Sequence, residues 1–175
     1  MATATILETP RLLLREYVED DAAAVYQLGS DPLVNRFSSD ERLTSVEEAR
    51  AILRAHPLAD YRKYGYGRWA CILKETGVNI GFAGLKYLDD RKEVDVGYRL
   101  LPAYWGAGLA TEAALASIRY GFERLQLRRI IGLVVPENVA SVRVLEKCGL
   151  TCEGMTDFRG KRLALYAVAV ENFRV

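Results

Sequence analysis

A glycine-rich turn at the start of a helix is the stretch of this sequence with the clearest capacity for chemistry. Residues 93–100 alternate charged or small with apolar side chains, which predicts a half-buried strand, and Pro102 ends it because proline has no backbone donor. Gly106 and Gly108 then bracket a turn that leads into a helical run from Leu109 to Leu125. Such a turn directs several N–H groups and the positive end of the helix dipole at one spot. The stretch therefore predicts an anion site, and phosphate fits it best.

Other glycine-rich loops match this turn less well. A P-loop would require Lys-Ser or Lys-Thr after Gly108, and neither follows. A dinucleotide fingerprint has a longer spacing than that from Gly108 to Ala110, and no acidic residue closes a second strand about 20 residues on. From this stretch alone, a tight turn that merely joins a strand to a helix remains an open alternative.

A second stretch gives the turn its meaning. Asn138 and Ser141 precede the run Glu146-Lys147-Cys148-Gly149-Leu150, and together with the turn they resemble the GNAT superfamily of acyl-coenzyme-A-dependent N-acyltransferases, in its RimJ/RimL branch. That family's phosphate loop, Arg/Gln-x-x-Gly-x-Gly/Ala, is filled by Trp105-Gly-Ala-Gly108-Leu-Ala110. The opening Thr9-Pro10-Arg11-Leu12 and the stretch around Trp69 also occur in the branch. Leu150 departs from the family's usual Phe.

The pattern of elements agrees with the fold that the resemblance implies. It predicts a single domain over residues 1–175 of mixed α/β (α+β) class, with a central, mostly antiparallel sheet of about seven strands and about four helices. The sheet is expected to splay open between its fourth and fifth strands. The predicted strands are 11–15, 69–73, 80–88, 93–100, 129–135, 151–158 and 161–170, and the predicted helices are 22–29, 44–56, 110–125 and 139–147. Pro57 is expected to end the second helix.

The resemblance implies an enzyme that moves an acetyl group from acetyl-coenzyme A directly to a primary amine, on a protein N-terminus or a small molecule. It requires no metal and no covalent acyl-enzyme. A coenzyme-A-binding sensor or scaffold without turnover is the alternative from another class. A nucleotide-binding α/β module is disfavoured by the absent Lys-Ser/Thr and by the strand-rich start.

Coenzyme A would be held mainly by backbone groups. The turn would bind its pyrophosphate, the strand edge near Leu100 and Leu101 would pair with its pantetheine arm, and Asn138 would hydrogen-bond the same arm. Asn138 is also a plausible helix N-cap, and the two roles are compatible. The residues expected to contact the cofactor are Leu100, Leu101, Trp105, Gly106, Ala107, Gly108, Leu109, Ala110, Thr111, Asn138 and Ser141.

Three residues are candidates for the chemical step. The family often places its carboxylate base on the strand before the phosphate loop, where this chain has Glu93 and Asp95, and Asp95 stands at the family's frequent Glu. The alternative is a solvated strand face. Leu145 replaces the tyrosine that many members use as an acid, which leaves Ser141 as the candidate, unless its hydroxyl bonds back to the helix. The N–H group of Leu100 is a candidate oxyanion donor.

The acceptor side is less defined. By resemblance, Arg36, Phe37 and Ser38 lie where such enzymes border the acceptor, with a plain surface loop as the alternative. Trp69 either lines the acceptor pocket or belongs to the core.

Composition excludes several classes of protein. With 175 residues, half of them hydrophobic, the chain is long enough for one hydrophobic core. Its net charge of +1 produces no global electrostatic field that would attract nucleic acid or a membrane. Three cysteines without metal spacing, one histidine (His56) and no secretory or membrane-spanning run predict a reducing, cytoplasmic setting and no metal site. A homodimer is plausible by resemblance only.

Overall fold

One eight-stranded sheet organises the protein, whose computed structural model describes residues 5–38 and 40–174. Its strand order is β1-β2-β3-β4-β5-β6-β8-β7, and every neighbouring pair is antiparallel except β5 and β6. The strands are β1 Thr5–Glu8, β2 Leu12–Arg15, β3 Arg68–Leu73, β4 Val78–Leu88, β5 Glu93–Leu100, β6 Arg129–Val134, β7 Thr151–Phe158 and β8 Lys161–Ala169.

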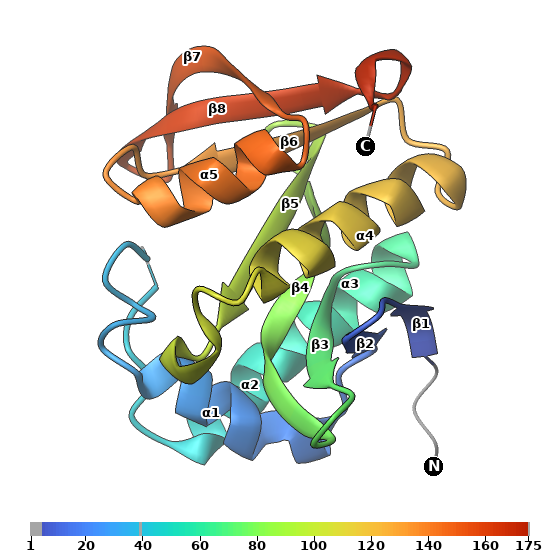
Figure 1. The fold of residues 1–175 in the computed structure, drawn as a ribbon. Helices are drawn as coiled ribbons and strands as arrows, with labels where there is room; N and C mark the ends of the chain where they lie inside the picture. The colour runs from blue at the N-terminus through green and yellow to red at the C-terminus, as the bar shows by residue number, and fades with distance from the viewer. Residues whose placement is uncertain (1–4, 39, 175) are drawn as a thin grey trace.

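The sheet opens between β5 and β6. These two strands are parallel and share a single register pair, Asp95 with Ile131. Beyond that pair β5 continues to Leu100 beside β4 alone, while β6 leaves with β7, β8 and α5 (Val139–Lys147), as Figure 1 shows. The predicted opening between the strands near 93–100 and 129–135 is therefore confirmed.

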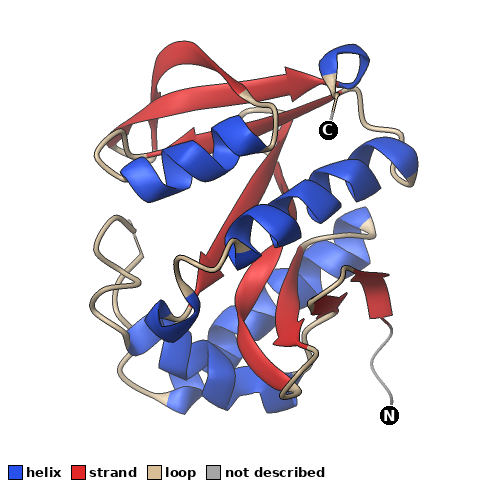
Figure 2. Ribbon diagram, in the orientation of Figure 1, coloured by secondary structure: helices blue, strands red, loops and turns tan. Residues whose placement is uncertain are grey.

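Five α-helices flank the sheet in the described residues, where about four were expected. The helices α1 (Ala22–Ser30), α2 (Val46–Ala55) and α3 (Pro57–Tyr64) lie on one face, and α4 (Leu109–Glu123) covers the other (Figure 2). Three short 3-10 helices complete the set: Glu19–Asp21, Pro102–Tyr104 and Val170–Asn172.

Besides the 3-10 helices, one α-helix and one strand were not predicted. Pro57 begins α3 instead of only ending the helix before it, because proline lacks the N–H that a first helical residue leaves unpaired anyway. The strand β1 is four residues long and forms by pairing with β2, a partner that local sequence does not reveal. The helix α2 begins with a reciprocal cap: Ser45 accepts the N–H of Glu48, and Glu48 accepts the N–H of Thr44.

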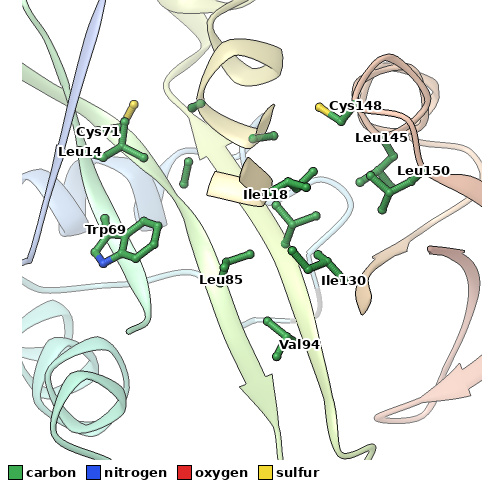
Figure 3. Close-up of a cluster of buried hydrophobic side chains, with 14 of the residues drawn as sticks. Leu14, Trp69, Cys71, Leu85, Val94, Ile118, Ile130, Leu145, Cys148 and Leu150 are labelled. Atoms are coloured by element: carbon green, nitrogen blue, oxygen red, sulfur yellow. The ribbon is translucent and has the colours of Figure 1, made fainter. Parts of the chain in front are cut away.

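The main core lies between the sheet and α4. It joins Leu14, Leu85 and Ile130 of the strands to Ile118 of α4, and extends to Leu145 of α5 and to Cys148, which caps the end of that helix (Figure 3). This core fixes α4, and with it the turn before the helix, on one face of β4 and β5.

Candidate functional site

The turn before α4 has the geometry of an anion site. Gly106 and Gly108 adopt φ angles of 77° and 79°, in the left-handed region that favours glycine. Gly108 is the N-cap of α4, and the N–H groups of Leu109, Ala110 and Thr111 find no acceptor among the described residues. A Cβ added at Gly106 would meet nothing within 4 Å. The turn thus presents free donors at the positive end of a 15-residue helix.

The N-terminal segment holds this turn in place. The guanidinium of Arg11 donates to the carbonyl of Ala107 at 2.8 Å and to the carboxylate of Glu112 at 2.7 Å. The same carboxylate accepts the hydroxyl of Thr9 at 2.6 Å. The Thr-Pro-Arg opening was a recognition motif in the sequence, and the structure gives it a mechanical role: it ties α4 and its turn to the strand β2.

A cleft of about 690 Å³ runs along the opening in the sheet. Most of the predicted site residues line it, from the turn at one end to the loop before α2 at the other: Arg36, Phe37, Ser38, Asp95, Leu100, Trp105, Gly106, Gly108, Leu109, Ala110, Thr111, Asn138 and Ser141. Glu93, Trp69, Leu101 and Ala107 do not line it.

The edge of β5 that faces the cleft is free at Leu100. The N–H of Leu101 donates to Ile80 of β4 at 2.9 Å. Because consecutive residues of a strand point their N–H groups to opposite edges, that of Leu100 faces the opening. The N–H of Leu100 is therefore directed at the cleft, as pairing with a ligand there would require. Leu101, by contrast, uses its N–H within the sheet and is buried. The carbonyl of Leu100 accepts the indole N–H of Trp105 at 2.7 Å, which fastens the turn to the strand end.

Asn138 caps α5 across the cleft, as predicted, with its side-chain oxygen accepting the N–H of Ser141 at 3.3 Å. The carbonyl of Ser141 in turn accepts the hydroxyl of Tyr98, on β5, at 2.8 Å. Tyr98 therefore spans the opening. Burial raises the pKa of Tyr98 well above its usual value, so its hydroxyl stays a donor. In the sequence, Tyr98 could be read only as an apolar strand position.

Asp95 does not lie on a solvated strand face, so that alternative is wrong. It is 8% exposed, because β5 is covered on both faces. One carboxylate oxygen is paired with Arg68, and the other accepts the N–H of Leu133 at 3.2 Å. Burial raises the pKa of Asp95, and Arg68 opposes that shift. Leu133 lies just past the last pairing of β5 with β6, so the carboxylate replaces the lost strand partner.

Two glycines make room for this ion pair. Arg68, on β3, stands in one row of the sheet with Gly84 of β4 and Gly97 of β5. Its guanidinium lies across that row, and a Cβ added at Gly97 would come within 2.3 Å of it. The guanidinium also donates to the carbonyl of Gly84 at 2.6 Å. Arg68 was not singled out from the sequence, because its partner lies 27 residues away.

Two predicted site residues lie elsewhere. Glu93 sits at the far end of β5, where its carboxylate accepts from Arg129 at 3.1 Å and from Arg91 at 3.4 Å, outside the cleft. Trp69 is 1% exposed and packs edge-on against Tyr120 of α4, so of its two proposed places the core is confirmed. In the register of β3, the side chain of Trp69 points to the face of the sheet that α4 covers.

The end of the cleft around Ser38 is rich in charge. Arg99 of β5 donates to the hydroxyl of Ser38 at 3.0 Å and pairs with Asp40 at 3.2 Å. Lys161 of β8 donates to the carbonyl of Ser38 at 2.9 Å. Ser38 was expected at the acceptor side, which stays a prediction; Arg99, Asp40 and Lys161, which contact it, were not singled out from the sequence. These residues are up to 123 positions apart in the sequence, so only the fold brings them together.

The other end carries cations alone. Arg143 and Lys147 lie one turn apart on α5 and line the cleft opposite the glycine turn. With the free N–H groups of α4, they make this end suited to a ligand with several phosphates. The cleft thus has one end with free N–H groups and cations, a free strand edge in its middle, and a charged end around Ser38.

Two buried thiols lie outside the hydrogen-bonding groups described above. Burial raises the pKa of Cys71 and of Cys148 to about 12, so both thiols stay protonated. No group of three His, Cys, Asp or Glu side chains suited to a metal occurs in the part of the chain that the structure describes. In the same residues, no helix has the length and apolar character needed to cross a bilayer.

Comparison with known proteins points to one family. The sequence model of the acetyltransferase (GNAT) domain matches residues 11–151. An uncharacterized N-acetyltransferase of Bacillus subtilis, YoaA, is 34% identical over 151 residues, which is 86% of this chain and 85% of YoaA.

Solved structures agree with that match. The GNAT acetyltransferase of Bacillus anthracis is 27% identical and superposes with a TM-score of 0.80 over 94% of this chain and 98% of its own. RimL, a ribosomal L7/L12 α-N-protein acetyltransferase solved with coenzyme A, is 21% identical, with a TM-score of 0.79 over 97% of this chain and 99% of its own. At that identity the likeness to RimL is one of fold.

Proposed function

Because the chain belongs to the GNAT family of N-acetyltransferases, we propose that it transfers the acetyl group of acetyl-coenzyme A directly to a primary amine bound at the Arg99–Lys161 end of the cleft. The observation that carries this proposal is the glycine turn, whose free N–H groups open onto the same cleft as the unpaired edge of β5 at Leu100. A sensor could use both features to bind coenzyme A, whereas stabilisation of a developing oxyanion by the Leu100 N–H serves turnover alone.

Binding follows from the chain's own groups. The N–H groups from Gly106 to Thr111 receive the phosphates, with Arg143 and Lys147 on the facing wall. The edge of β5 receives the amide-bearing arm as an added strand would be received. Asn138 faces the same arm from α5. The backbone contacts make side-chain identity in the turn of small importance, apart from the two glycines.

The reaction forms a bond between the acceptor nitrogen and the acetyl carbon and breaks the carbon–sulfur bond. The Leu100 N–H is placed to stabilise the negative oxygen that develops on the acetyl group. The nitrogen must lose a proton and the departing sulfur must gain one. Among the described residues, Asp95 and Asp40 are the carboxylates that line the cleft. We assign the acceptance of the first proton to Asp95, through water. The Ser141 hydroxyl donates the second proton to the sulfur as it takes one up from solvent water.

The acceptor is a protein N-terminal amine or a small amine. The Thr-Pro-Arg opening, the Trp105 loop and the fold shared with RimL support a RimJ/RimL-like assignment. A cytoplasmic setting and a homodimer stay predictions.

The test is calorimetric titration with acetyl-coenzyme A, followed by thiol release with N-terminal peptides and small amines. We expect binding, and release with some of them. Binding without release from any amine would favour the sensor.

A variant pair tests the turn itself. Gly108→Val should weaken acetyl-coenzyme A binding more than tenfold, because a side chain at positive φ distorts the turn and shields its N–H groups. Gly77→Val is the matched control: Gly77 has φ 70° with nothing near its Cβ position, but lies in the β3–β4 turn. Equal affinity in the two variants would remove the phosphate assignment.

A further inference from the structure

We infer that the acceptor carries an anionic group, a carboxylate or a phosphate, close to the amine that is acetylated. The inference rests on the proposed function and names the class of its acceptor. The anionic group would bind between Arg99 and Lys161, with Arg36 at the rim of the cleft.

Two cations converge on one loop residue. Arg99 approaches Ser38 from β5, at 3.0 Å to its hydroxyl, and Lys161 approaches it from the start of β8, at 2.9 Å to its carbonyl. These strands lie on opposite sides of the opening in the sheet. Ser38 therefore receives one cation from each side of the opening, and Arg99 also pairs with Asp40.

The charges at this end do not cancel. Its lining includes four cations, Arg36, Arg68, Arg99 and Lys161, against two carboxylates. Asp95 forms an ion pair with Arg68, and Asp40 forms one with Arg99. Among the described residues, neither Arg36 nor Lys161 has a carboxylate partner; Arg36 lies over the ring of Phe37 instead.

Asp40 neutralises Arg99 only in part. Its side chain is 66% exposed, and an exposed ion pair is weak. Burial would raise the pKa of Asp40, but Arg99 and Ser38 outweigh that effect and keep it below its usual value, so Asp40 is ionised at neutral pH. Lys161 uses one of its three N–H donors and Arg99 keeps donors free, which leaves hydrogen-bonding capacity for an incoming anion.

This excess has two consequences for an acceptor. A polycationic amine is repelled by Arg36 and Lys161, whereas an amine with a neighbouring carboxylate or phosphate is attracted. The same cations favour the neutral, nucleophilic form of the bound amine, because a nearby like charge disfavours the ammonium. Charge selection and proton loss therefore act in the same direction.

The experiment compares matched acceptors. The peptides Ala-Asp-Ala-Ala, Ala-Asn-Ala-Ala and Ala-Lys-Ala-Ala, all C-terminally amidated, differ in one side chain. Alanine against alaninamide tests whether a free amino acid supplies the anion, and spermidine is the polycation. We expect kcat/KM for the Asp peptide to exceed that for the Asn peptide by on the order of tenfold, the size of one partly buried charge pair, with the Lys peptide and spermidine below both.

Variants locate the preference. Lys161→Gln should abolish most of the Asp-over-Asn ratio and leave the affinity for acetyl-coenzyme A unchanged, while Lys161→Arg should retain the ratio. Arg162→Gln is the matched control, because Arg162 is the next residue of β8 but pairs with Asp157 and does not line the cleft. The wild-type ratio should also fall as salt is raised.

The outcomes separate the two proposals. Thiol release at equal rates with the Asp, Asn and Lys peptides, or a Lys161→Gln variant that loses activity equally on all of them, would overturn the anionic-acceptor inference and leave the acetyltransferase proposal in place. Binding of acetyl-coenzyme A with no release from any amine in the set would overturn both.

Discussion

Arg68 and Asp95 form a largely buried ion pair that lines the site. Their side chains are 18% and 12% exposed, and the pair lies across the row of Gly84 and Gly97. Removal of one partner leaves a buried charge without compensation. We therefore expect Arg68→Met or Asp95→Asn to cost about 3–5 kcal/mol in the free energy of unfolding.

The double variant should cost clearly less than the sum of the single ones, measured by urea unfolding, since it leaves no lone charge. The exposed pair Lys74 and Glu8 provides the control cycle, with a coupling below about 1 kcal/mol. Strict additivity for Arg68 and Asp95 would contradict the buried pair.

The same variants test the proton acceptor. If Asp95 accepts the amine proton, Asp95→Asn should remove the acidic limb of the pH profile of kcat. Arg68→Met keeps the carboxylate but removes the charge that opposes the rise in its pKa, so the limb should move to higher pH. A limb that neither variant moves would assign the proton transfer to another group.

At the scale of elements, the attachment of α4 to the N-terminal segment depends on one carboxylate. Burial alone would raise the pKa of Glu112, but the bonds from Thr9 and Arg11 outweigh it and hold the pKa below its usual value. A lowered pKa in the folded state means that this stabilisation is complete above about pH 4.5 and is lost as the pH falls.

Glu112→Gln should therefore destabilise the protein by about 1–2 kcal/mol at pH 7, a value discounted because Arg11 is half-exposed. The difference from wild type should shrink as the pH falls below about 4.5, in urea unfolding at a series of pH values. Glu123→Gln, at the exposed end of the same helix, is the control with an effect within about 0.5 kcal/mol. A difference independent of pH would show that the charge of Glu112 is not responsible.

At the scale of the whole molecule, the cleft separates two groups of elements. The strands β1–β5 with α1–α4 meet β6–β8 with α5 through one strand register pair, the shared hydrophobic core against α4, and side-chain bonds that include those of Asp95, Tyr98 and Lys161. A ligand seated in the cleft contacts both groups, so it binds the folded state only.

Acetyl-coenzyme A at about 100 times its Kd should stabilise the fold by about 2.7 kcal/mol, which corresponds to a rise in Tm of roughly 5–10 °C for a chain of this size. Thermal unfolding with and without acetyl-coenzyme A measures it. Gly77→Val should keep the shift and Gly108→Val should lose it at the same concentration. A wild-type Tm that does not move would contradict a cleft that binds this ligand.

The sequence by itself determined the features that depend on residues close together along the chain. The helix 139–147 with its Asn138 cap, the two glycines before α4 and the strand 93–100 were predicted correctly, because caps, positive φ angles and alternation act within a few residues. The opening in the sheet came from the motif resemblance.

Only the tertiary structure decided what Asp95, Glu93 and Trp69 contact. Alternation along β5 says which residues share a face, but β5 is covered on both faces, so it could not say that Asp95 is buried against Arg68 while Glu93 pairs with Arg129. The meeting of Arg99 and Lys161 at Ser38 likewise depends on the register of distant strands. Strand register is fixed by long-range packing, and no local pattern encodes it.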